Sequence, residues 1–244
     1  MAELDLTIAA AADGRDLLAA AQTDWLRPIP HCPGWDAAAL VGHMGGILSW
    51  MTRIVATGER VGRADRETPP PDLAALAPWY SAHLDRTLEV LSITPPDAPV
   101  WTFSSRGDRR AGWWRRRLAV ELAIHRWDAQ HAAGVPARPV NAEVAAAGVE
   151  EFLTEFLPGL LAQPGVEGLT GTLHLHTTDG PSEWWADLDA RVGAVAVRRH
   201  ANADTAVWGT ESDLLLWLTN RAPTPTIEVL GRCDLAARWA QLRR

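Results

Sequence analysis

The sequence lacks the features that mark several common classes of protein. Its two cysteines, Cys32 and Cys233, lie far apart and form no CxxC pair, which argues against a zinc knuckle or a disulfide framework. The densest basic cluster, Arg115–Arg117, is short and the net charge is -7, so nucleic-acid binding is not expected. No apolar run approaches the ~18 residues that a membrane helix needs. Met1–Ile8 has no basic segment typical of a signal peptide.

What is present is typical of a globular protein. Apolar residues make up 47% of the 244-residue chain, enough for a substantial core. Thirteen tryptophans stand against one tyrosine and three phenylalanines, which predicts a tryptophan-rich core. There is no P-loop, no GxGxxG after a strand and no GxSxG. We expect a cytoplasmic monomer or small homo-oligomer that has small-molecule partners and no membrane partner.

The first part of the chain is predicted to be helical. Helical spacing of apolar residues, N-capping aspartates and proline- or glycine-rich interruptions set the limits of each helix. The expected helices are Leu6–Ala21, one from the cap Asp36 to about Ala56, Asp72–Leu91, Trp113–Ala133 and Asn141–Leu161.

The pattern changes after Gln163, where alternating residues predict strands. The expected elements are strands at Leu169–Thr177, Glu183–Leu188, Val192–Arg199 and Thr226–Leu230, and helices at Glu211–Asn220 and Asp234–Leu242. We therefore expect an α+β protein with a helical bundle over residues 1–163 and a small α+β domain over residues 164–244.

The second predicted helix carries a histidine in its apolar face. Leu40, Ile47 and Ile54 share that face with His43 when successive residues are placed about 100° apart. A histidine there points toward the core, where its nitrogens need partners. Taken alone, His43 is explained most simply as a core histidine bonded to a backbone carbonyl.

The fourth predicted helix changes this interpretation. Glu121 and His125 are four residues apart, so their side chains lie one above the other. We expect them to point inward together with Asp128, because the opposite, solvent-facing side would be formed by other residues. Those residues are Arg115, Ala119, Ala123, Arg126 and Gln130. The alternative is a surface ion pair between Arg117 and Glu121, which requires a solvated face.

Two histidines and one glutamate from two helices suit a tetrahedral zinc ion with one open position. His43, Glu121 and His125 are therefore the predicted ligands, although nickel or iron would accept the same set. Asp128 lies one turn further along the face. It is assigned to the cofactor site, either orienting His125 or acting as a fourth ligand.

Other histidines and Cys32 favour simpler explanations. His174 and His176 alternate on one predicted strand and could bind a metal, but a half-exposed strand face is the favoured interpretation. His31 and His131 are expected to be solvated. Cys32 has no visible partner base, so a structural role is favoured.

Three motifs and two later segments carry a resemblance to a known family. They are Pro30-His-Cys-Pro-Gly-Trp35, Leu40-Val-Gly-His-Met44, Glu121-Leu-Ala-Ile-His-Arg-Trp-Asp-Ala129, Leu173-His-Leu-His-Thr-Thr-Asp-Gly180 and Ser212-Asp-Leu-Leu-Leu-Trp-Leu218 with Arg221. Nearly the whole chain resembles the mycothiol-dependent maleylpyruvate isomerase family of the DinB-like superfamily. The resemblance implies a DinB-like four-helix bundle followed by a sterol-carrier-like α+β domain.

The resemblance also implies a cofactor set. It implies a divalent metal, usually zinc, held by His43, Glu121 and His125, and mycothiol as the thiol that the metal activates. A metal-bound thiol is held as the nucleophilic thiolate, so no protein cysteine would be needed. The partners would be this low-molecular-weight thiol and a small electrophile, which is isomerised or receives the thiol. Arg221 is the position that matches a catalytic arginine of the family's second domain.

Two other functions stay open on the sequence. One is a DinB-like metalloenzyme that acts without mycothiol in biosynthesis or hydrolysis. The other is a non-catalytic ligand-binding protein with a structural metal. An open coordination position on the metal would exclude the binding protein, and dependence of the activity on a thiol would separate the two enzymes.

Overall fold

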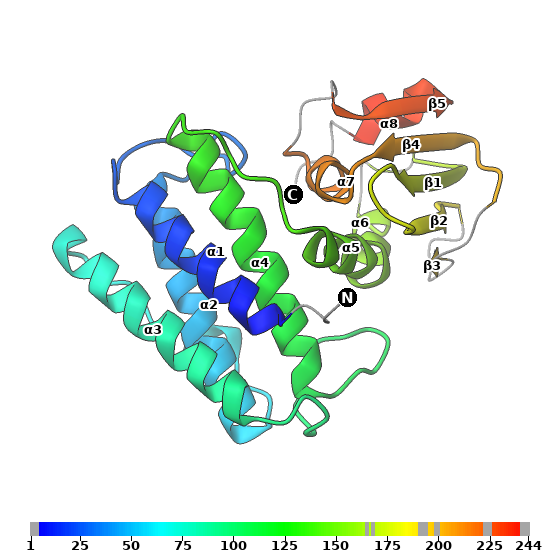
Figure 1. Cartoon of the computed structure of the whole chain (residues 1–244). Coiled ribbons are helices and arrows are strands. Elements are labelled where there is room, and N and C mark those ends of the chain that lie inside the picture. The colour runs from blue at the N-terminus through cyan, green and yellow to red at the C-terminus, as the bar shows by residue number, and fades with distance from the viewer. Residues whose placement is uncertain are drawn as a thin grey trace. The chain divides into compact units, whose positions relative to one another are not determined.

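The computed structural model describes residues 5–163, 166, 169–189, 195–197, 201–221 and 226–239. The chain divides into two compact units, Met1–Pro139 and Val140–Arg244, and each is described by itself. Helices form the first unit, while a sheet and further helices form the second (Figure 1). The α+β class expected from the sequence is confirmed.

Four long helices form the first unit. They are α1 (Leu6–Ala21), α2 (Ala37–Thr57), α3 (Leu73–Ile93) and α4 (Ala111–Ala132). Aspartates 5, 36 and 72 cap the first three, each accepting a hydrogen bond from a backbone N–H in the first turn. In the bundle, α1 packs mainly against α4 and α2 against α3. The predicted bounds of all four helices are confirmed within about two residues.

The predicted tryptophan-rich core is present in this unit. Trp113 and Trp114 are almost fully buried, and the ring of Trp114 meets that of Trp50 edge-on at a centroid distance of 5.4 Å. Phe103 lies edge-on to Trp113 at 4.5 Å. Edge-to-face pairs of this kind are the favoured arrangement of aromatic rings. The cluster therefore fixes one end of α4 and, through it, the ligand-bearing turns that follow.

Glycine permits a close approach of α2 and α3. A Cβ atom on Gly45 would collide with ring carbons of the Trp79 side chain. Because α2 carries His43 one turn from its midpoint, the spacing of these two helices bears directly on the candidate site. Ser49 is also buried, so α2 is enclosed on more sides than its apolar face alone.

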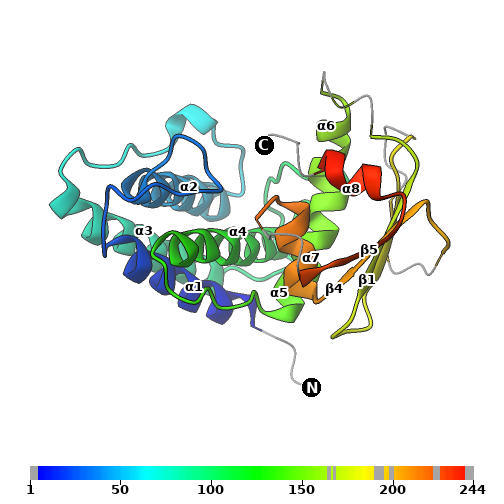
Figure 2. The ribbon, with the colours of Figure 1, turned by 90° about the horizontal axis from the view of Figure 1, so that it is seen from above.

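The second unit begins with a continuous helical stretch and continues into a sheet. The stretch comprises α5 (Ala142–Glu151), a π-helical turn (Phe152–Phe156) and α6 (Leu157–Leu161). The strands are β1 (Thr172–Thr177), β2 (Glu183–Asp187), β3 (Val195–Val197), β4 (Thr205–Gly209) and β5 (Glu228–Gly231), in the order β3-β2-β1-β4-β5. Only the β1–β4 pair among these is parallel. Helices α7 (Glu211–Leu218) and α8 (Cys233–Trp239) pack on one face (Figure 2).

Two features of the second unit differ from the sequence prediction. The strand β4 was missed, although it is a central strand paired with both β1 and β5. The division between the units falls at Pro139–Val140, before the boundary expected near Gln163. The reason is that α5 packs against α7, and the backbone N–H of Val140 donates to Ser212 Oγ at 2.9 Å. The last predicted helix, Asp234–Leu242, is described only as far as Trp239, and parts of the predicted strand Val192–Arg199 lie outside the described residues.

Among the described residues, no helix has both the length and the apolar character needed to cross a membrane.

Candidate metal and thiol site

Helices α2 and α4 supply the three side chains predicted as metal ligands. His43 lies two turns into α2, whose start is fixed by the Asp36 cap. Glu121 and His125 lie one turn apart on α4. The Nε2 atom of His125 is 3.6 Å from Glu121 Oε2, and the rings of His43 and His125 are 5.7 Å apart between centroids. The structure therefore places the three side chains near one another, but they are not among the groups of described residues whose donor atoms all lie within 4.8 Å of one another.

These distances are compatible with one shared ion. At the usual distance of ~2.0–2.1 Å between zinc and an imidazole nitrogen, two rings on one tetrahedral ion have centroids roughly 5.2 Å apart. The observed separation of 5.7 Å is slightly wider, so a small rotation of the side chains would bring both rings onto one ion. A carboxylate and two imidazoles are also the donor types that zinc accepts in sites with an open position. The residues present thus fit a divalent ion.

Asp128 fixes the orientation of His125. Its Oδ2 atom lies 3.0 Å from His125 Nδ1, so the opposite ring nitrogen, Nε2, is directed toward Glu121. Asp128 is fully buried and His125 is only 7% exposed. A carboxylate on the far nitrogen of a ligating histidine sets its tautomer and ring angle. Of the two roles considered for Asp128, this geometry favours orientation of His125 over service as a fourth ligand beside His43, Glu121 and His125.

The loop before α2 also reaches this site. Trp35 packs its ring against His43 at a centroid distance of 4.6 Å. Cys32 lies with its Sγ atom 3.7 Å from Asp128 Oδ2. Cys32, His125 and Asp128 each offer a donor atom within 4.8 Å of the others. The sequence showed no partner for Cys32, because only folding of the loop brings this cysteine to Asp128 on α4.

His125 consequently belongs to two candidate ligand sets, one on each ring nitrogen. Through Nε2 it faces Glu121 and lies beside His43, and through Nδ1 it faces Asp128, near Cys32. The first set leaves Asp128 in an orienting role. The second would use the cysteine as a thiolate ligand. These sets make different predictions for substitutions of His43 and Cys32.

The electrostatic environment keeps His43 neutral. The pKa of His43 is lowered from 6.5 to about 4, chiefly by burial and also by the neighbouring His125, while Glu121 acts in the opposite direction. Arg66 and Arg117 also lower the pKa of His43. A neutral imidazole has a lone pair available for a metal. Two guanidinium groups therefore lie close enough to act on this ring, alongside the carboxylate of Glu121.

The ion pair considered as an alternative explanation for Glu121 is present. Arg117 and Glu121 form a short ion pair, with side chains only 13% and 15% exposed. The alternative explanation required a solvated helix face. These exposures show that the pair does not lie on one. Arg117 offsets the charge of a mostly buried carboxylate, and the second carboxylate oxygen still faces His125.

Family models identify both parts of the chain. Residues 8–130 match the mycothiol maleylpyruvate isomerase N-terminal domain, and residues 143–238 match the C-terminal domain of the same family. The chain belongs to the mycothiol maleylpyruvate isomerase family. No curated protein sequence matches it significantly.

Solved structures agree with this assignment at the level of the fold. A mycothiol-dependent maleylpyruvate isomerase is 12% identical with a TM-score of 0.59, and a mutant of that enzyme with one histidine replaced by alanine is 14% identical with the same score. Each match covers 92% of this chain and 91% of the other. A sterol carrier protein 2 like 2 from Aedes aegypti is 22% identical over 42% of this chain and all of its own, but its TM-score of 0.33 is too low to support a conclusion. The sterol-carrier-like character of the second unit stays a prediction.

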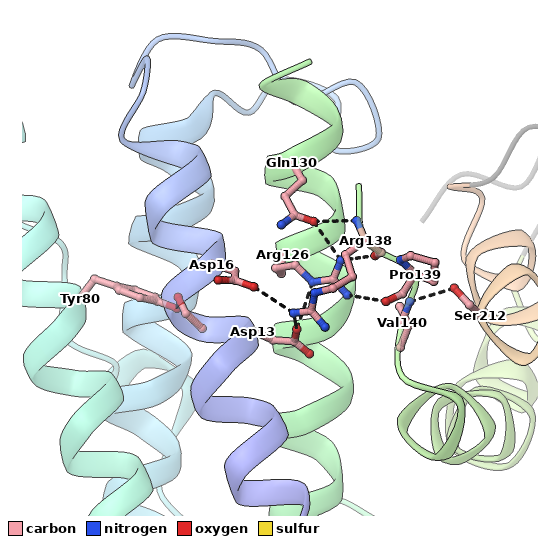
Figure 3. A network of polar contacts seen from close by, with 10 residues as sticks. Asp13, Asp16, Tyr80, Arg126, Gln130, Arg138, Pro139, Val140 and Ser212 are labelled. Atoms are coloured by element: carbon pink, nitrogen blue, oxygen red, sulfur yellow. Dashed lines mark hydrogen bonds and ion pairs between the residues drawn. The ribbon is translucent and has the colours of Figure 1, made fainter. Parts of the chain in front are cut away.

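In this member of the maleylpyruvate isomerase family, one face of α4 was assigned wrongly from the sequence. Ala119, Ala123 and Arg126 were expected to face solvent, but all three are buried. The cause is α1, which packs along that side of α4. Arg126 donates from Nε to Asp13 Oδ1 at 3.1 Å and from Nη2 to the carbonyl of Pro139 at 3.2 Å (Figure 3). Buried Arg126 thus joins three segments of the first unit directly behind His125.

The remaining predicted residues lie elsewhere in this family member. Arg221 follows α7 in the second unit, where its Nη1 donates to the carbonyl of Thr219 at 2.9 Å. Its catalytic role stays a prediction. His31 is half-buried against the rings of Trp127 and His131, so it is not fully solvated as expected, whereas His131 is exposed. His174, expected on a half-exposed face, is buried.

Proposed function

We propose that this protein binds one divalent metal, most simply zinc, through His43, Glu121 and His125, and uses it to activate mycothiol for attack on a small electrophile. The observation that carries the proposal is the orientation of His125. Asp128 occupies its Nδ1 atom, which directs Nε2 toward Glu121 and the neighbouring ring of His43. A bound divalent ion would lower the pKa of a thiol and hold it as thiolate.

The protein's own side chains have separate tasks in this proposal. Trp35 covers one side of the site by packing on His43, which would shield that side of the imidazole from solvent. Arg66, and Arg117 in its ion pair with Glu121, carry positive charges near His43 that would favour a thiolate and a negatively charged electrophile over neutral molecules. Asp128 keeps the His125 tautomer that presents a lone pair at Nε2. Isomerisation and thiol transfer both begin with the same attack by the thiolate, so the site accommodates either outcome.

Membership of the family supports mycothiol as the thiol, and the matched solved structures are named as mycothiol-dependent enzymes. Arg221 is proposed as a catalytic residue on the sequence resemblance alone.

Metal analysis of four variants tests the ligand set. His125→Ala removes the residue common to both candidate sets and is expected to lose the metal from this site. His43→Ala should lose it as well, whereas Cys32→Ser should retain it, because Cys32 belongs only to the set on the Nδ1 side. His83→Ala is the matched control. His83 lies on α3, pairs with Glu67 at 3.1 Å and belongs to neither set. Loss of metal from Cys32→Ser with retention in His43→Ala would reverse the assignment.

Turnover measured with and without mycothiol tests the thiol. The wild-type protein is expected to convert a reactive, negatively charged alkene or epoxide only when the thiol is supplied. Full activity without any thiol would reject the mycothiol proposal while leaving the metal assignment intact. Full activity of a His125→Ala protein shown to contain no metal would reject metal activation.

A further inference from the structure

The second unit contains another cluster of possible metal-binding side chains, on the sheet. His174 and His176 are two residues apart in β1, so both project from the same face. The antiparallel register places Glu183 of β2 directly opposite His176. Leu173 and Leu175 project from the other face and are almost fully buried. We conclude that the two imidazoles and the carboxylate lie together on the face opposite the one that α7 and α8 cover.

The carboxylate of Glu183 lies between the two rings. Its Oε2 atom is 3.1 Å from His174 Nε2, and its Oε1 atom is 3.1 Å from His176 Nδ1. One donor atom from each of the three residues lies within 4.8 Å of the others. Ligand atoms at ~2.0–2.1 Å from a tetrahedral zinc ion are roughly 3.3 Å apart. The observed contacts are close to this spacing, so only small side-chain rotations are needed to surround an ion.

The surroundings combine a rigid frame with access from solvent. His174 is 5% exposed, while the side chains of His176 and Glu183 are 26% and 20% exposed. The three side chains come from two hydrogen-bonded strands, and the ring of Trp208 on β4 packs against His176 at a centroid distance of 4.3 Å. A half-buried site held by strands and packing keeps its ligands in place when empty. An ion can therefore enter from the exposed side without unfolding of the sheet.

We propose that His174, His176 and Glu183 form a second divalent-metal site, suited to zinc, with a fourth position open to water or a small ligand. The donor set is two imidazoles and one carboxylate, as in the first candidate site, but it lies in a different unit and uses β-strand rather than helical spacing. The proposal does not depend on the proposed function of the first site. Its alternative is a metal-free cluster in which Glu183 is hydrogen-bonded to His174 and makes only an ion-pair contact with His176.

Zinc content of the full-length protein, prepared without a histidine tag, distinguishes these possibilities. The protein is saturated with zinc, desalted and analysed for metal per chain. Wild type is expected to retain two equivalents, and Glu183→Gln, which keeps the size of the side chain, should retain one. The control His83→Ala should match wild type, because the His83–Glu67 pair has the same 3.1 Å contact but lies in neither of the clusters identified among the described residues. Wild-type content in both Glu183→Gln and a His174→Ala, His176→Ala variant would overturn the proposal.

A cobalt titration in the His125→Ala background isolates the second site. Cobalt(II) is expected to produce visible absorption bands that saturate at about one equivalent per chain, and these bands should be absent when Glu183→Gln is added. Circular dichroism of both variants verifies that they are folded. Absence of cobalt binding to folded His125→Ala protein would overturn the second site. Full metal content in His125→Ala together with loss in Glu183→Gln would instead reject only the first site.

Discussion

Arg126 provides the most demanding test of the structure, because its guanidinium is fully buried beside the candidate ligand His125. Besides its bonds to Asp13 and to the Pro139 carbonyl, it donates to Gln130 Oε1 at 3.0 Å and to the carbonyl of Arg138. Burial lowers the pKa of Arg126, and the carboxylate of Asp13 acts in the opposite direction. The perturbation is Arg126→Met, which fills similar space and removes the charge and all four bonds.

The expected loss of stability follows from what the substitution leaves behind. Removing one partner of a buried ion pair costs about 3–5 kcal/mol, because the other charge stays buried. Here Asp13 is 3% exposed, but Arg138 Nη2 remains 2.7 Å from its Oδ1 atom, which favours the lower end of that range. We expect about 3 kcal/mol, or a fall in Tm of roughly 6–12 °C for a chain of this size.

Urea denaturation of the metal-free protein, followed by circular dichroism and tryptophan fluorescence, measures this loss. Arg86→Met is the matched control, because Arg86 pairs with Glu89 at 2.6 Å on an exposed helix surface and should lose less than about 1 kcal/mol. In an Asp13→Asn background, Arg126→Met should cost less than in wild type, since no unpaired carboxylate remains. A loss below about 1 kcal/mol in Arg126→Met would show that α1 does not enclose this side of α4.

Three further predictions concern other parts of the chain. Gly45→Ala should destabilise the protein by about 1–3 kcal/mol in denaturation curves, because the added methyl group meets the indole ring of Trp79 on α3. Gly159→Ala in α6 is the control. A Cβ atom there meets nothing within 4 Å, so this change should be neutral or stabilising by up to ~1 kcal/mol. A Cys32→Ser, Cys233→Ser protein should keep more than about half of the thiol-dependent turnover, since a non-ligating cysteine is replaced at little cost; a folded, metal-loaded but inactive variant would contradict this. Burial raises the pKa of Glu211, so the folded state holds that proton to higher pH than the unfolded state, and stability falls as pH rises through the window between its ordinary and raised pKa. Glu211→Gln should flatten that fall in thermal denaturation at a series of pH values, and an unchanged slope would argue against it.

Local sequence was sufficient for most of the helices. Capping aspartates at positions 36 and 72 and the proline- and glycine-rich interruptions fix where α2 and α3 begin, because these signals act within one turn. The pairing of Glu121 with His125 was equally local, since four-residue spacing on a helix places two side chains together whatever surrounds it. That His43 lies beside them was inferred from its apolar face, and the structure places it there. Ligation of a metal by the three remains a proposal.

Tertiary structure alone decided the features that join distant segments. Cys32 and Asp128 are 96 residues apart, and Glu183 reaches His176 only through the strand register. The strand β4 was missed because its identity depends on a parallel pairing with β1 across a long connection. Arg126 was placed in solvent because helical periodicity gives the angular positions of side chains but not which neighbouring helix covers them. An arginine becomes buried when partners such as Asp13 and the Pro139 carbonyl are folded onto it, and no spacing within α4 contains that information.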